Sequence, residues 1–105
     1  MKQEVTLHHQ RVKLDQGVIQ VIQYKGGSGS SEQEAVIILG AESELEGVDA
    51  EYEFIQSLHT EFELDSQTFL EKRNKKYDIL TVKLPGGTKK DIWFDITDFY
   101  GREDD

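Results

Sequence analysis

The chain has 105 residues, of which 36% are hydrophobic and 31% are charged, and its formal net charge is −9. These values are typical of one soluble domain, and they exclude a transmembrane, collagen-like or wholly disordered protein. The chain contains no cysteine, which excludes disulfide scaffolds, thiolate metal sites and cysteine nucleophiles.

The negative charge is concentrated in the middle of the chain. Residues 26–71 contain twelve acidic residues and no lysine or arginine, while the flanking segments are nearly neutral. Such a segment repels nucleic acids and anionic membranes and attracts cationic partners, although it can also serve solubility alone. We therefore expect a single domain over residues 1–105 that binds neither nucleic acid nor membrane. The N-terminal residues include no apolar signal sequence, so we expect a cytoplasmic protein.

The first part of the chain predicts β-structure. Residues 4–25 contain two β-rich runs around the turn signal Asp15-Gln16-Gly17, which predicts a hairpin. Residues 26–31, rich in glycine and serine, predict a flexible loop. Residues 33–40 predict a third strand, and the apolar run at 35–39 predicts that it lies centrally in the sheet.

The acidic middle of the chain predicts a loop and two helices. We expect an acidic loop over residues 41–47 and a helix over residues 48–62, where apolar residues follow helical spacing. Acidic residues in the first turns of that helix are favoured by the helix dipole. A second, shorter helix is expected from Asp65 or Ser66 to about Asn74, because basic residues gather at its C-terminal end.

The last part of the chain predicts a second hairpin. Strands over residues 77–84 and 89–99 are joined by the turn sequence Pro85-Gly86-Gly87-Thr88, and residues 102–105 form a short acidic tail. The predicted order is β-β-β-α-α-β-β. We therefore expect an α+β fold in which a five-stranded, mainly antiparallel sheet has two helices packed on one face.

Three side chains are candidates for a buried polar or acid–base role. Glu51 lies in the middle of the apolar stripe of the first helix, where it either caps the helix N-terminus or has a raised pKa. His59 has Glu63 one helical turn further on, a spacing that suits a metal or an acid–base pair. Asp95 lies beside Trp93 in the last strand. Each of them also has a structural explanation, and no complete catalytic or metal-binding motif is present, so we expect no enzymatic activity, cofactor or metal.

The composition leaves three hypotheses for function. The first is a non-catalytic protein that binds a basic partner surface, in the manner of an inhibitor or immunity protein, through acidic residues and aromatic contacts. The second is a structural module that self-associates through its sheet, as a homodimer for example. The third is a small hydrolase or metal-binding enzyme that uses Glu51, His59 and Asp95. The residues expected to contact a basic partner are Glu42, Glu44, Glu46, Asp49, Glu53, Tyr52 and Trp93.

Overall fold

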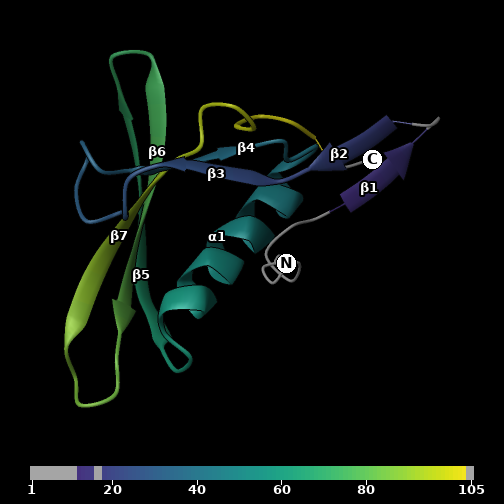
Figure 1. Cartoon of the computed structure of the whole chain (residues 1–105). Coiled ribbons are helices and arrows are strands. Elements are labelled where there is room, and N and C mark those ends of the chain that lie inside the picture. The colour runs from purple at the N-terminus through teal and green to yellow at the C-terminus, as the bar shows by residue number, and fades with distance from the viewer. Residues whose placement is uncertain (1–11, 16–17, 104–105) are drawn as a thin grey trace.

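The computed structural model describes residues 12–15 and 18–103. Figure 1 shows one helix, α1, beside a twisted sheet, with a small hairpin apart from that sheet. In chain order the elements are β1 (Val12–Asp15), β2 (Val18–Val21), β3 (Gln23–Gly26), β4 (Val36–Leu39), α1 (Glu44–Leu58), β5 (Glu63–Lys72), β6 (Lys75–Lys83) and β7 (Lys89–Asp95).

The main sheet has five strands in the order β3-β4-β7-β6-β5. Neighbouring strands are antiparallel except β4 and β7, which run parallel, with Val36 opposite Phe94. The predicted antiparallel sheet with two helices is therefore wrong, since the described chain is mostly β, with a mixed sheet and a single helix. The parallel pair arises because the chain passes through α1, β5 and β6 before β7 returns beside β4.

The hydrophobic core lies between α1 and the three inner strands of the sheet. Alternate residues of each strand face the helix, as the two-residue period of a strand requires. The fully buried core side chains include Ile38 from β4, Ile55 from α1, Leu80 from β6 and Phe94 from β7. The apolar run at residues 35–39 thus becomes β4, which lies inside the sheet between β3 and β7.

The segment predicted as a second helix is instead strand β5. It pairs with β6 along its whole length through a two-residue turn, in which Arg73 and Asn74 both have positive φ, of 54° and 66°. Two successive positive φ values characterise the tight hairpin turn whose twist matches that of the strands. Basic residues are favoured at the C-terminus of a helix, so the basic residues around this turn were wrongly interpreted as a helix end.

Helix α1 begins and ends earlier than predicted. It spans Glu44–Leu58, so most of the expected acidic loop at 41–47 belongs to the helix. The Ser43 hydroxyl accepts a hydrogen bond from the Glu46 amide at 3.2 Å, which is the usual contact of an N-cap serine. Gly47 lies directly against the ring of Phe99, where a Cβ would come within 2.3 Å of the ring. Glycine therefore lets the first turns of α1 approach the segment after β7 closely.

The predicted C-terminal hairpin is confirmed as β6 and β7. Their turn closes with a hydrogen bond from the Gly87 amide to the Leu84 carbonyl at 2.9 Å, and Gly86 provides the positive φ, 93°, that follows Pro85. Strand β7 ends at Asp95 and not at residue 99 as predicted, because residues 97–101 form turns.

The N-terminal hairpin is present but shorter than predicted. Strands β1 and β2 pair antiparallel, with Val12 opposite Val21, whereas β3 leaves this hairpin and joins the main sheet. Residues 4–11 of the predicted hairpin, Gln16 and Gly17 of its turn, and residues 104–105 of the predicted tail lie outside the described residues. Of the chain that is described, no helix is long and apolar enough to cross a membrane.

The Gly/Ser-rich segment connects β3 to β4 and contacts β7. The buried Gly29 receives a hydrogen bond from the Trp93 amide at 2.8 Å and donates one to the Glu34 carbonyl at 2.6 Å. The segment therefore continues the contact that β4 makes with β7.

Candidate functional site

The N-terminus of α1 carries several of the acidic residues expected to bind a partner. Ser43 and Glu46 form the pattern of a capping box, and the Glu46 carboxylate accepts a hydrogen bond from the Glu42 amide at 3.1 Å. The Glu44 carboxylate accepts a bond from the Gly101 amide at 2.6 Å. Glu44 and Glu46 therefore stabilise the start of the helix, where negative charge is favoured.

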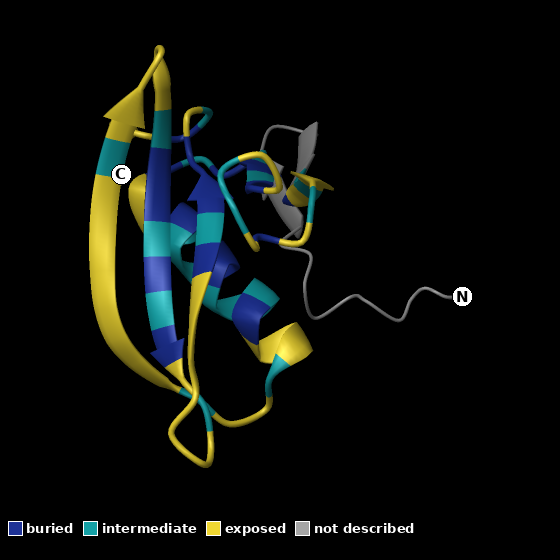
Figure 2. Cartoon of the chain, turned by 90° about the vertical axis from the view of Figure 1, so that its left-hand side faces the viewer, coloured by how far each residue is buried: buried dark blue, intermediate teal, exposed yellow. Residues whose placement is uncertain are grey.

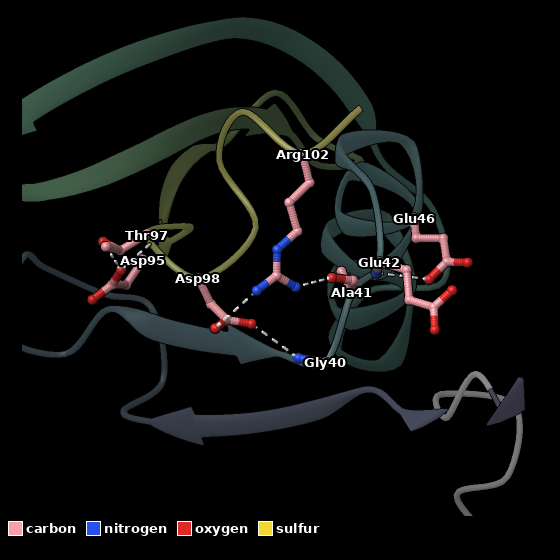
Figure 3. Close-up of polar contacts among 8 residues, drawn as sticks. All are labelled: Gly40, Ala41, Glu42, Glu46, Asp95, Thr97, Asp98 and Arg102. Atoms are coloured by element: carbon pink, nitrogen blue, oxygen red, sulfur yellow. Dashed lines mark hydrogen bonds and ion pairs between the residues drawn. The ribbon is translucent and has the colours of Figure 1, made fainter. Parts of the chain in front are cut away.

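A second polar cluster ties the C-terminal turn to the same end of the helix (Figure 3). Arg102 donates a hydrogen bond to the Ala41 carbonyl at 2.6 Å and lies 3.7 Å from the Asp98 carboxylate. The other Asp98 oxygen accepts a bond from the Gly40 amide at 3.2 Å. The link between β4 and α1 is thus fixed by residues about 60 positions later in the chain.

The remaining acidic residues of this group lie further along α1. Asp49 and Glu53 are half-buried, and the helix carries five acidic residues and no basic one. Tyr52 is half-buried too, and burial together with the neighbouring carboxyl groups of Glu51 and Asp78 raises the pKa of its hydroxyl. The contact residues expected on α1 therefore belong to one acidic element.

Glu51 lies beneath α1 and is fully buried. It is eight residues beyond the N-cap Ser43, so the capping role expected for it belongs to Glu46. Neither oxygen of Glu51 has ordinary hydrogen-bonding geometry with a described partner, and the nearby Asp78 of β6 is also buried. Burial is the main cause that raises the pKa of Glu51 to about 10, and the Asp78 carboxyl raises it further.

The structure does not bring Glu51, His59 and Asp95 together. His59 is the C-cap of α1, and its amide donates to the Ile55 carbonyl at 2.8 Å, so Glu63 in β5 is not one helical turn away. Asp95 follows the core residue Phe94 and points to the opposite side of the sheet. Its carboxylate accepts bonds from the amide and hydroxyl of Thr97, at 3.0 and 2.6 Å (Figure 3).

The aromatic residues of the last strand divide between the two faces of the sheet. Trp93 is half-buried on the face away from α1, where its ring meets that of Tyr77 edge-on at 5.8 Å. Phe99 is buried in the core, and Tyr100 stacks on Phe69 at 5.1 Å. Trp93, Phe99 and Tyr100 therefore do not share one exposed surface, and Trp93 lies on a different face of the sheet from the acidic residues of α1.

Two other features bear on ligand binding. An open depression of about 610 Å³ lies between the end of α1 and the β6–β7 turn, lined among others by Phe62, Lys83 and Pro85. It does not include Glu51 or Asp95. Within residues 12–15 and 18–103, no group of three or more histidine or carboxylate side chains has the arrangement of a metal site.

No protein-family model matches the chain, and comparisons with curated proteins and with solved structures found no significant similarity. The site must therefore be judged on its own geometry.

Two parts of the site's geometry were not predicted from the sequence. The pattern Ser43-x-x-Glu46 marks the start of α1 and could have been found, whereas the contact of Glu51 with Asp78 joins two distant elements.

Proposed function

We propose that the protein is a non-catalytic binding protein whose partner presents a basic surface. The observation that carries this proposal is the surface formed by α1 and the residues next to its N-terminal turn. The helix provides four acidic residues to this surface, Glu44, Glu46, Asp49 and Glu53, and no lysine or arginine of its own, while its fifth acid, Glu51, is buried beneath the helix. Leu45 is 60% exposed on the same element. Apolar side chains rimmed by charge are typical of protein interfaces.

Exposed aromatic side chains extend this surface beyond the helix. Tyr100 is 44% exposed, and it neighbours Gly101, whose amide is bonded to Glu44. Phe69, on which Tyr100 stacks, is 45% exposed on the α1 side of β5. Trp93 lies on the other face of the sheet, so the proposed surface uses Tyr52 and Tyr100 as its aromatic contacts.

The proposal rests on charge, so its test is the salt dependence of association. The protein is used to capture partners at low salt, and the association rate with a purified captured protein is then measured at several salt concentrations. We expect a basic protein whose association slows by about tenfold or more between low and physiological salt. Recovery of partners that are not basic, or a rate that salt does not change, would contradict the proposal.

Matched charge variants separate α1 from the rest of the acidic segment. Asp49→Asn with Glu53→Gln removes two charges from the helix, and Glu34→Gln with Glu61→Gln removes two charges from exposed positions of the acidic segment outside the helix. We expect the first pair to slow association several-fold and the second pair to change it little. Equal effects of both pairs would show that only net charge matters.

We also propose that the protein acts in the cytoplasm. The chain contains no cysteine, so its fold needs no disulfide bond and is compatible with a reducing compartment.

A further inference from the structure

The outer strand β5 has the features of a pairing surface. Among the described strands it contacts β6 alone, and nine of its ten residues are exposed, as the outer yellow strand of Figure 2 shows. Proteins usually protect such an edge with short strands, proline or central charges. Strand β5 is ten residues long, contains no proline, and has no charge between Ser66 and Leu70. Its protective features lie toward its two ends, in a register shift near Asp65 and in four charged side chains, and its middle has none.

The hydrogen bonds of β6 show which groups of β5 point to the free edge. The Lys76 amide donates to the Thr97 hydroxyl at 3.0 Å, and the Lys76 carbonyl accepts from the Ile96 amide at 2.8 Å. Both groups of Lys76 therefore face away from β5, and Glu71 opposite it is not hydrogen-bonded to β6. Because the pattern alternates, the N–H and C=O groups of Gln67, Phe69 and Glu71 point to the free edge.

The charges along β5 favour antiparallel pairing with a second copy of the strand. The strand begins with the acids Glu63 and Asp65 and ends at the bases Lys72 and Arg73. Antiparallel pairing places the acidic end of one copy beside the basic end of the other, whereas parallel pairing would place like charges together. Opposite charges across a strand pair stabilise it, and like charges destabilise it.

The same charges distinguish between registers that join the outward-pointing groups. With Phe69 opposite Phe69 of the second copy, Gln67 faces Glu71 and Asp65 lies beside Arg73. A register centred on Thr68 would place Asp65 opposite Glu71. A register centred on Gln67 would instead place Glu63 opposite Glu71. Both of these alternatives oppose two acids, whereas the register centred on Phe69 opposes none and is therefore favoured over them.

We propose that two copies of the chain pair antiparallel through β5, with Phe69 at the two-fold axis, to form a continuous ten-stranded sheet. The pairing accounts for the exposed stack of Phe69 on Tyr100, because the two Phe69 rings meet on the α1 side of the joined sheets. This dimer does not depend on a basic partner, and each proposal can fail while the other holds.

The first test is sedimentation equilibrium of the full chain over a wide range of concentrations. We expect a monomer–dimer equilibrium. Gln67→Pro should raise the dimer dissociation constant by about tenfold or more, because the two-fold axis makes each substitution remove two bonds between copies. The Gln67 amide does not bond to β6, so the fold survives. Gln67→Ala keeps the amide and should dimerise as the natural chain does.

The second test determines the register with single cysteines, since the chain has none of its own. Phe69→Cys, Thr68→Cys and Gln67→Cys are oxidised in parallel, and each can form a disulfide only between two copies. We expect the Phe69→Cys variant to cross-link about tenfold faster than the others, because only there do the two Cα atoms lie within the range for a disulfide. A chain that stays monomeric, a dimer unaffected by Gln67→Pro, or equal cross-linking at all three positions would overturn the proposal.

Discussion

Strands β6 and β5 are neighbours joined by a two-residue turn, yet they lie in opposite environments. In β6, Asp78, Leu80 and Val82 are buried beneath α1, while β5 is exposed at almost every residue (Figure 2). Helix α1 thus covers the inner strands and leaves the outer one open. The difference shows that burial fixes β6, whereas backbone pairing and the turn hold β5, whose surface is free for another molecule.

The largest expected effect tests this contrast at one cross-strand pair, Leu80 and Gln67. Leu80→Ala opens a cavity in the core and should lower the free energy of unfolding by about 2–5 kcal/mol. Gln67→Ala should change it by less than about 0.5 kcal/mol, because that side chain is exposed. Urea unfolding measures both values. Similar losses from the two variants would show that β5 is buried to the same extent as β6.

The second prediction concerns the acid buried on the covered side. The pKa of Glu51 is about 10 in the folded protein, whereas the ordinary value, which applies to the unfolded chain, is 4.5. The folded state therefore keeps a proton that the unfolded state loses above pH 4.5. Stability therefore falls as the pH rises between these two values. Glu51→Gln removes the titration and should stabilise the protein by about 3 kcal/mol at pH 7.

Chemical unfolding at pH 5 and pH 8 measures this effect. The gain from Glu51→Gln should be small at pH 5 and larger at pH 8, and Glu61→Gln, at an exposed acid in the loop after α1, should show no such trend. A gain that does not grow with pH would mean that Glu51 is ionised in the folded protein.

The sequence predicted those elements whose signals are local. The apolar run at residues 35–39 predicted the inner strand β4, and Pro85 with Gly86 predicted the turn between β6 and β7. Other local signals were misinterpreted: the Ser43-x-x-Glu46 box was assigned to a loop, and the basic residues around Arg73 were assigned to a helix end.

The parallel pairing of β4 with β7 joins strands separated by more than fifty residues and leaves no local pattern. The candidate site was limited in the same way. The position of Glu51 among apolar residues pointed to a buried carboxyl group, but its neighbour Asp78 belongs to another element. His59 and Asp95 were grouped with it by residue type alone, and the fold separates them.

A smaller effect is expected at the start of α1. Ser43→Ala removes the N-cap hydrogen bond and should lower the stability by about 1 kcal/mol. Ser57→Ala in the last turn of α1 is the matched control, since Ser57 is exposed and does not cap the N-terminus. Thermal unfolding of both variants compares them, and an equal loss would argue against capping as the reason why α1 begins at Glu44.

The smallest effect on stability is expected at the end of β5. Lys72 at the end of β5 lies 2.9 Å from Glu32, and both side chains are partly exposed. Such pairs contribute about 0–1 kcal/mol, so Lys72→Ala should change the stability little, and added salt should not enlarge the change. A loss comparable to that of Leu80→Ala would mean that this ion pair, rather than pairing with β6, holds β5 in place.

Amide hydrogen exchange along β5 tests the central claim most directly, because it observes the free edge residue by residue. The amides of Thr68 and Leu70 bond to β6 and should be protected at every protein concentration. The amides of Gln67, Phe69 and Glu71 should exchange rapidly in dilute solution and become protected as the concentration rises. If these three amides exchange equally fast at all concentrations, β5 is an open edge that does not pair with a second copy.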